Sequence, residues 1–201
     1  MPTTVGIVLG AGSSRRMGRP KQTLALGDTT LLGWVLRAVE DSSLDRVVLV
    51  LGGAADEARA AVTPRRARIA DNGAYGEGCA SSLLAGLDAA GACDAVMLLL
   101  GDMPGVDAEV IDEARRHWET HRPWGLVTRY EDGLGHPFVF ATAAFPALRE
   151  LHGDKAVWKL LDRHPGRVRE VRVALPLPRD VDTPEDYEAV RLALAPVTRS
   201  A

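Results

Sequence analysis

The sequence predicts an α/β fold: one domain built on a Rossmann-like, doubly wound and mostly parallel sheet. Segments of strand-like composition alternate with segments of helical periodicity along the chain, an order that is typical of parallel sheets. Several strand segments are apolar throughout, among them Ala95–Leu100, as strands are when helices cover both faces of their sheet. At 201 residues the chain has the length of one domain with a substantial core.

The expected elements follow one another in a regular order. We expect strands at Val5–Leu9, Arg46–Leu51, Ala67–Ala70, Ala95–Leu100, Gly125–Thr128, Phe138–Phe140 and Val168–Val173. We expect helices at Leu31–Glu40, Asp56–Val62, Ala80–Ala89, Ala108–His121, Ala143–Leu151, Ala156–His164 and Pro184–Leu194. The expected domain covers residues 1–195, and residues 196–201 are expected to form a frayed tail.

Composition excludes several classes of protein. The net charge of −3 gives no electrostatic case for nucleic-acid binding. The two cysteines, Cys79 and Cys93, have neither metal-ligand spacing nor the pattern of a disulfide framework. The start of the chain lacks the features of a secretory signal, and its longest apolar run is too short to cross a bilayer. We therefore expect a cytoplasmic protein with no nucleic-acid or membrane partner.

The stretch from Val8 to Lys21 is the most informative part of the chain. It follows an apolar strand segment and combines three glycines with four cations, namely Gly10, Gly12, Gly18, Arg15, Arg16, Arg19 and Lys21. Glycines let backbone N–H groups approach an anion closely, and the cations supply the charge that a polyphosphate requires. A loop of this kind after a strand predicts a nucleotide site.

Two better-known glycine motifs do not fit this stretch. A P-loop has Gly-Lys followed by Ser or Thr, whereas Gly18 is followed by Arg19. The dinucleotide fingerprint has a third glycine where Arg15 stands, and an acidic residue at the end of its second strand. Here that strand runs into Gly52 and Gly53, so a dinucleotide-dependent oxidoreductase is only a distant alternative.

Acidic residues at two places are candidate metal ligands. Asp102 comes just after the strand Ala95–Leu100, and the next helix has a more natural N-cap in Asp107. Asp180 and Asp182 precede a helix start that Thr183 and its neighbours cap without them. Mg²⁺ is commonly held by one or two carboxylates together with substrate phosphates. We expect Asp102 to pair with Asp182 or with Asp180, and favour Asp182 narrowly.

With these motifs in place, the chain resembles the MobA-like nucleotidyltransferases, and among them the molybdenum cofactor cytidylyltransferases. The opening motif is matched, with Gly10 in place of an alanine, by Leu9, Ala11, Gly12, Ser14, Arg16, Met17, Gly18 and Lys21. The resemblance continues in order through Asn72–Leu83, Gly101–Pro104, Gly135–Pro137 and Asp180–Tyr187. It therefore covers most of the chain.

The resemblance implies a fold of the nucleotide-diphospho-sugar transferase type and a Mg²⁺-dependent reaction. A phosphate of the acceptor attacks the α-phosphorus of a nucleoside triphosphate, and pyrophosphate leaves. The implied catalytic residues are Arg16, Lys21 and Asp102, with Asp102, Asp182 and Asp180 toward the metal. The implied nucleotide site comprises Leu9, Gly10, Ala11, Gly12, Ser13, Ser14, Arg16, Lys21, Asn72, Ser81 and Ser82.

The implied acceptor is a molybdopterin-type cofactor, and the resemblance also implies contact with a molybdenum hydroxylase. Its implied acceptor-binding residues are His136, Pro137 and Asp154. Taken alone, His136 stands between a turn glycine and a proline that we expect to start a strand. Relatives usually have Gly-Asp-x-Gly-Ala-Arg near Asp154, whereas this chain has Ala156, Val157 and Trp158 in the last three positions. The identity of the acceptor therefore stays open.

The nucleobase also has alternatives. The pair Ala11-Gly12 resembles the cytidylyl pattern, whereas guanylyl relatives tend to have two glycines there. CTP is therefore the favoured nucleotide. The alternatives are transfer of GMP or another nucleotide to a different phosphorylated cofactor precursor or sugar phosphate, and a non-catalytic protein that holds a cofactor for a partner.

Overall fold

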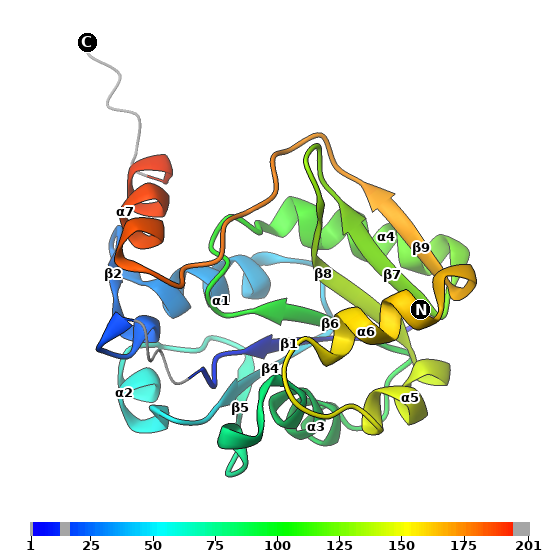
Figure 1. The fold of residues 1–201 in the computed structure, drawn as a ribbon, viewed down its shortest axis with the longest axis horizontal. Helices are drawn as coiled ribbons and strands as arrows, with labels where there is room; N and C mark the ends of the chain where they lie inside the picture. The colour runs from blue at the N-terminus through cyan, green and yellow to red at the C-terminus, as the bar shows by residue number, and fades with distance from the viewer. Residues whose placement is uncertain (1, 13–16, 195–201) are drawn as a thin grey trace.

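A computed structural model describes residues 2–12 and 17–194. Its centre is a seven-stranded sheet in the order β5-β4-β1-β6-β8-β7-β9 (Figure 1). The strands are β1 (Thr4–Leu9), β4 (Arg46–Leu51), β5 (Ala67–Asp71), β6 (Ala95–Leu100), β7 (Gly125–Arg129), β8 (Leu134–Ala141) and β9 (Val168–Arg172). Only β8 runs antiparallel to its neighbours β6 and β7, while the other pairs are parallel. The prediction of a mostly parallel sheet is confirmed.

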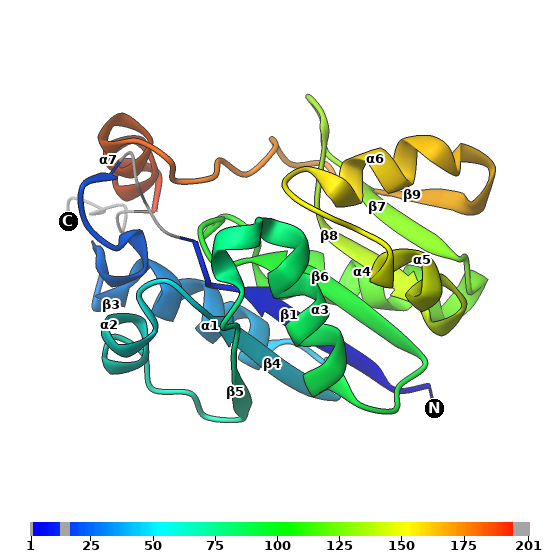
Figure 2. The ribbon, with the colours of Figure 1, turned by 60° about the horizontal axis from the view of Figure 1, so that its bottom comes forward.

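Helices cover both faces of this sheet, as Figures 1 and 2 show. The helices are α1 (Leu31–Asp41), α2 (Ala55–Ala60), α3 (Cys79–Ala90), α4 (Ala108–His121), α5 (Phe145–Arg149), α6 (Ala156–Arg163) and α7 (Pro184–Ala193). One apolar cluster joins α1 and α4 to one face, and a second joins α3, α5 and α6 to the other. Within residues 2–12 and 17–194, no helix is long and apolar enough to cross a membrane.

A smaller cluster lies beside the sheet and was not predicted. The two-residue strands β2 (Ala25–Leu26) and β3 (Thr29–Thr30) form a hairpin whose turn includes Gly27 at φ 60°. Leu24 and Leu26 pack there with Val190 of α7. The strands are too short for an alternating pattern to be visible in the sequence.

Strand β8 corrects the sequence prediction. It begins at Leu134 rather than Phe138, so Gly135, His136 and Pro137 lie inside the strand and do not form its entry turn. Pro137 lies where the register between β7 and β8 shifts, and a strand tolerates a residue without an N–H donor at such an irregularity. The helix expected at Ala143–Leu151 is also shorter, a 3-10 turn at Thr142–Ala144 followed by α5.

Capping residues fall where the sequence places them. Asp107 accepts a hydrogen bond from the N–H of Val110 and caps α4. Thr183 and Asp186 form a reciprocal capping box at the start of α7. Asp102 therefore has no part in starting a helix.

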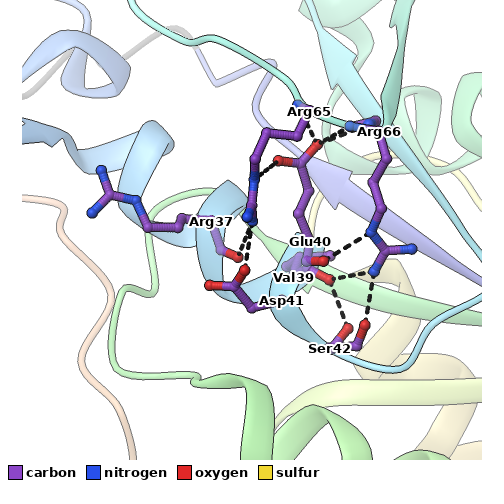
Figure 3. Close-up of polar contacts among 8 residues, drawn as sticks. Arg37, Val39, Glu40, Asp41, Ser42, Arg65 and Arg66 are labelled. Carbon is purple, nitrogen blue, oxygen red and sulfur yellow. Dashed lines mark hydrogen bonds and ion pairs between the residues drawn. The ribbon is translucent and has the colours of Figure 1, made fainter.

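A buried carboxylate joins the end of α1 to the start of β5 (Figure 3). Glu40 Oε1 accepts hydrogen bonds from the N–H groups of Arg65, Arg66 and Ala67 at 2.9, 2.8 and 2.8 Å. The Arg66 guanidinium donates to carbonyls at the carboxyl end of α1 and just beyond, those of Val39, Glu40, Ser42 and Leu44. These contacts hold the first crossover of the sheet against its second.

Candidate functional site

The main cleft lies at the carboxyl ends of β1 and β6, where ligands bind in open α/β sheets. Its volume is about 610 Å³, and it is lined by residues 9–12, 21–22, 75–79, 100–102 and 153–154 together with Ser82 and Asp182. Segments from distant parts of the chain thus converge on one hollow.

The Gly10–Gly12 loop presents donors to this cleft. The carbonyls of Gly10 and Gly12 accept hydrogen bonds from Gln22 Nε2 at 2.9 and 2.8 Å. The Ala11 carbonyl accepts from the N–H of Gly53, and the N–H of Gly10 donates to Val50. The N–H groups of Ala11 and Gly12 have no acceptor within the described part of the chain. Because the carbonyls are satisfied and these two donors are not, the loop is suited to an anion.

Lys21 lies next to this loop and connects two carboxylates. Its Nζ lies 2.5 Å from Asp102 Oδ2 and 2.8 Å from Asp182 Oδ1, and it also donates to the Val181 carbonyl at 2.9 Å. Burial by itself would lower the pKa of Lys21, but the two carboxylates more than offset this, so its pKa lies above the usual value. The side chain is a largely buried ammonium, 11% exposed, between two carboxylates.

One carboxylate oxygen of Asp102 has no hydrogen-bond partner among the described residues. This oxygen, Oδ1, is buried, while Oδ2 contacts Lys21. Burial raises the pKa of Asp102, Lys21 opposes that rise, and the charges of Asp180 and Asp182 add to it. A buried carboxylate oxygen without a donor is costly unless a cation or a proton meets it.

This donor set fits a cation that shares its ligands with a substrate. No group of three or more His, Cys, Asp or Glu suited to a metal occurs among the described residues. Mg²⁺ accepts one or two carboxylates and takes its remaining ligands from phosphates and water. Asp102 and Asp182 lie close together, since both contact Lys21 Nζ, and they could supply these two carboxylates. Asp180 is exposed and does not line the cleft, and it acts on Asp102 through its charge.

The predicted serine segment is held by a buried asparagine. Asn72 Nδ2 lies 2.9 Å from both Ser81 Oγ and Ser82 Oγ, and Asn72 Oδ1 accepts from the N–H of Ala74. Ser82 lines the cleft, whereas Asn72 and Ser81 do not. Asn72 thus contacts the serines rather than the open space.

Asp154, another residue that lines the cleft, caps helix α3. Gly78, the N-cap of α3, has no side chain to accept a bond, and Asp154 Oδ1 instead accepts from the N–H of Cys79 at 3.0 Å. The Gly153 carbonyl accepts from Ala80. A side chain at Gly78 would meet the backbone of Gly153 at 2.7 Å, and Gly78 has a φ of 98°. The two loops therefore fit only with glycine there.

His136 and Pro137 lie away from the cleft lining. The His136 Nδ1 donates to the Leu98 carbonyl at 3.1 Å, and its ring centroid lies 4.0 Å from that of Phe138. Burial lowers the pKa of His136 to about 4, with the Leu98 bond opposing that shift. Trp158 meets Phe138 edge-on in the same apolar cluster. The structure does not bring His136 and Pro137 together with Asp154.

Three predicted residues, Ser13, Ser14 and Arg16, lie outside the described residues. Among the lining residues that were not predicted as site residues, Gln22 and Tyr75 carry the largest side chains in contact with the glycine loops. Gln22 is the single glutamine of the chain and directly follows Lys21. Tyr75 packs against Gly52 and Gly53, where any added Cβ would come within 3.0 Å of it. The glycine pair after β4 is the signal in the sequence that a side chain comes close there.

Comparison with known proteins gives the family of the chain. The model of the MobA-like NTP transferase domain matches residues 6–168. The chain is 28% identical over 200 residues to the nicotine blue oxidoreductase of Paenarthrobacter nicotinovorans, covering 94% of each chain. It is 28% identical over 207 residues to the purine catabolism protein PucB of Bacillus subtilis, covering 96% of this chain and 98% of that one. Identity is 32% over 131 residues to the "Probable molybdenum cofactor guanylyltransferase" of Opitutus terrae, covering 64% and 61%.

Two solved structures are similar over nearly the whole chain. One is a homologue of Mycobacterium tuberculosis Rv0371c from Mycobacterium sp. strain JC1, with a TM-score of 0.87 and 39% identity, covering 95% of this chain and 96% of that one. The other is Rv0371c of M. tuberculosis H37Rv in complex with manganese, with a TM-score of 0.78 and 37% identity over 95% and 98%. With a family model matching most of its residues, this chain belongs to the MobA-like NTP transferase family.

Proposed function

We propose that this protein transfers CMP from CTP to a phosphorylated acceptor of the molybdopterin type, with Mg²⁺ as the metal. An acceptor phosphate oxygen forms a bond to the α-phosphorus, the bond from that phosphorus to the β-phosphate oxygen breaks, and pyrophosphate leaves. The observation that carries the proposal is the unpaired donor pair of Ala11 and Gly12 beside Lys21, Asp102 and Asp182. Such transfers depend mainly on positioning and on charge stabilisation.

Each residue has a role in this proposal. The N–H groups of Ala11 and Gly12 bind phosphate oxygens, and Lys21 stabilises charge on the triphosphate. Asp102 and Asp182 hold the metal, which when bound neutralises charge on the reacting phosphates. The manganese complex of a relative 37% identical to this chain supports a divalent metal in this family. Arg16, Ser13 and Ser14 keep the roles that the resemblance gives them.

The preference for CTP rests on Ala11. This residue is 6% exposed, and its methyl group lies where a side chain at Gly52 would meet it at 2.7 Å. Ala11 and Tyr75 both line the cleft beside Gly52, and the Ala11 methyl group takes space that a glycine would leave free. A smaller base is therefore favoured there, while the relative named as a guanylyltransferase makes GTP the alternative.

The acceptor is proposed from the family alone. Asp154 lines the cleft and remains a candidate contact to it, whereas a role for His136 and Pro137 would have to act through the strand β8. Contact with a molybdenum hydroxylase is part of the same proposal.

Calorimetric titration tests the proposal. The protein is titrated with CTP, GTP, ATP, UTP and NADPH, each with and without Mg²⁺. Metal-dependent binding with CTP tightest is the expected result, and transfer is then assayed by pyrophosphate release with molybdopterin cofactor. Tightest binding of GTP would overturn the base assignment and keep the reaction. Binding of NADPH alone would favour an oxidoreductase. One relative, the nicotine blue oxidoreductase, is named for such an activity. Binding of no nucleotide would favour a non-catalytic carrier.

A further inference from the structure

Gln22 stands behind the Gly10–Gly12 loop. The residue is 4% exposed, belongs to the 3-10 helix Lys21–Thr23, and still reaches the cleft lining. Its amide nitrogen has two hydrogens, and these reach the carbonyls on either side of Ala11, at 2.9 Å for Gly10 and 2.8 Å for Gly12. One side chain thus joins both ends of the loop.

These bonds fix which polar groups of the loop are free. A carbonyl oxygen that faced a phosphate would repel it, whereas an N–H group attracts it. Gln22 holds the carbonyls of Gly10 and Gly12, and Gly53 holds that of Ala11. Within the described residues, the groups left without a partner in this loop are the N–H donors of Ala11 and Gly12.

We propose that Gln22 is a positioning residue that sets the polarity of this loop toward phosphate. It acts on the ligand through the loop and through its chain neighbour Lys21, and it takes no part in bond making or breaking. The proposal rests on the proposed function, since it requires a phosphate-bearing ligand in the cleft. No other amide side chain contacts the loop within the described part of the chain.

The position of Lys21 depends on the same short helix. A Cβ at Gly12 would lie 3.9 Å from Lys21 Cε and 4.0 Å from Gln22 Nε2, so the loop and both side chains lie side by side. A change at Gln22 therefore alters the two groups proposed to meet the triphosphate. It leaves Asp102, just after β6, in place, because none of the hydrogen bonds described joins Asp102 to Gln22.

Two variants and one matched control test the proposal. Gln22→Met keeps the length of the side chain and removes both hydrogen bonds, while Gln22→Glu replaces the donor with an acceptor. The control is Thr23→Val, which removes one hydrogen bond from the same helix, that from Thr23 Oγ1 to the Pro20 carbonyl, without touching the loop. Circular dichroism and thermal unfolding first establish that each variant folds.

The ligands are pyrophosphate and whichever of CTP, GTP, ATP and UTP the wild-type protein binds most tightly. For Gln22→Met we expect the Kd for both to rise by about tenfold, the effect of losing roughly one oriented hydrogen-bonded contact. Gln22→Glu should weaken binding further, and Thr23→Val should change it less than about twofold. Turnover at saturating nucleotide should fall far less than affinity, so the rise in KM should exceed the fall in kcat.

The outcomes separate the two proposals. A wild-type protein that binds no nucleotide and no pyrophosphate overturns the proposed function before any variant is made. A wild-type protein that binds, with Gln22→Met binding equally well, overturns the role of Gln22 alone. A loss of nucleotide affinity with unchanged pyrophosphate affinity would likewise overturn it, because the defect would then lie at the base. Should Gln22→Met fail to fold, the folded Gln22→Glu protein answers the same question.

Discussion

Glu40 and Asp102 each have a carboxylate oxygen buried in the fold, and the two carboxylates differ in what binds them. The side chain of Glu40 is 2% exposed and receives three backbone N–H groups and the Arg65 guanidinium. Asp102 receives one side chain, that of Lys21, and its Oδ1 has no partner among the described residues. The hydrogen-bond acceptors of Glu40 are filled by groups of the protein, whereas Asp102 has one acceptor oxygen without a donor among the described residues.

The side chains are 2% and 21% exposed, and the larger difference between them is in their partners. A carboxylate whose acceptors are filled by backbone donors can only hold structure together, since those donors cannot leave without local unfolding. A carboxylate held by one long side chain can exchange that partner for another cation. The unfilled acceptor of Asp102 therefore lowers the stability of the fold, as polar groups at functional sites often do. The filled acceptors of Glu40 raise it.

Replacement of Asp102 should have the largest effect, and on activity alone. In Asp102→Asn the size is kept and the charge is lost, so we expect nucleotidyl transfer to fall at least about a thousandfold. The unfolding midpoint should stay the same or rise, because a buried charge is removed. Pyrophosphate release and thermal unfolding measure the two effects. Near-normal turnover would show that Asp102 does not carry the chemistry.

Replacement of Glu40 should have the opposite outcome. Glu40→Ala leaves three buried N–H groups without their acceptor, and we expect a loss of about 3–5 kcal/mol in the free energy of unfolding. Glu40→Gln keeps an acceptor oxygen and should lose only about 1 kcal/mol. Urea unfolding measures both, and turnover of the folded variants should match that of the wild-type protein. Equal losses for the two variants would mean that charge, and not acceptor geometry, holds this junction.

The same comparison shows what the sequence could predict. Asp102 and Asp182 could be singled out because they follow or precede regular elements and are not needed as caps, and the structure indeed caps those helices with Asp107 and Thr183. The sheet could be predicted because its central strands β1, β4 and β6 are nearly continuous apolar runs. Local patterns of this kind are visible in a single sequence.

Contacts between distant segments were not visible in that way. The bond from Cys79 to Asp154 spans 75 residues, and that from Lys21 to Asp182 spans 161. A single glutamine such as Gln22 has no spacing to mark it. The motif around His136 contains glycine and proline, which usually indicate a turn, while the register shift that lets them stay within β8 depends on the neighbouring strand.

His136 extends the comparison to a third buried ionisable group, which the fold has also given a partner. Its pKa is lowered by burial from 6.5 to about 4. Below pH 6.5, His136 therefore binds a proton in the unfolded chain, whereas in the folded protein it binds one only near pH 4. Stability should be fully present above pH 6.5 and should fall by roughly 3 kcal/mol as the pH drops to 4.

Urea unfolding at pH 7, 5.5 and 4.5 measures this dependence. His136→Phe should lower stability at pH 7, since the Leu98 carbonyl loses its donor, but should flatten the decline toward acid. If the variant declines as steeply as the wild-type protein, the acid sensitivity comes from other groups. Activity of the wild-type protein between pH 6 and 8 should show no titration from His136, in keeping with a structural group.

A change in metal affinity, smaller than the effects above, is the most direct test of whether Lys21 can be exchanged for a metal. Lys21 places its ammonium between Asp102 and Asp182, where a metal shared with substrate phosphate would also need to lie. Lys21→Met should abolish turnover, yet tighten Mn²⁺ binding to the nucleotide-free protein by about tenfold, because the Lys21 ammonium no longer competes with the metal for the two carboxylates. Arg59→Met removes the same charge from an exposed pair with Asp71 and should leave Mn²⁺ binding unchanged. Weaker Mn²⁺ binding in Lys21→Met, measured by electron paramagnetic resonance, would mean that Lys21 organises the carboxylates for the metal instead of standing in for it.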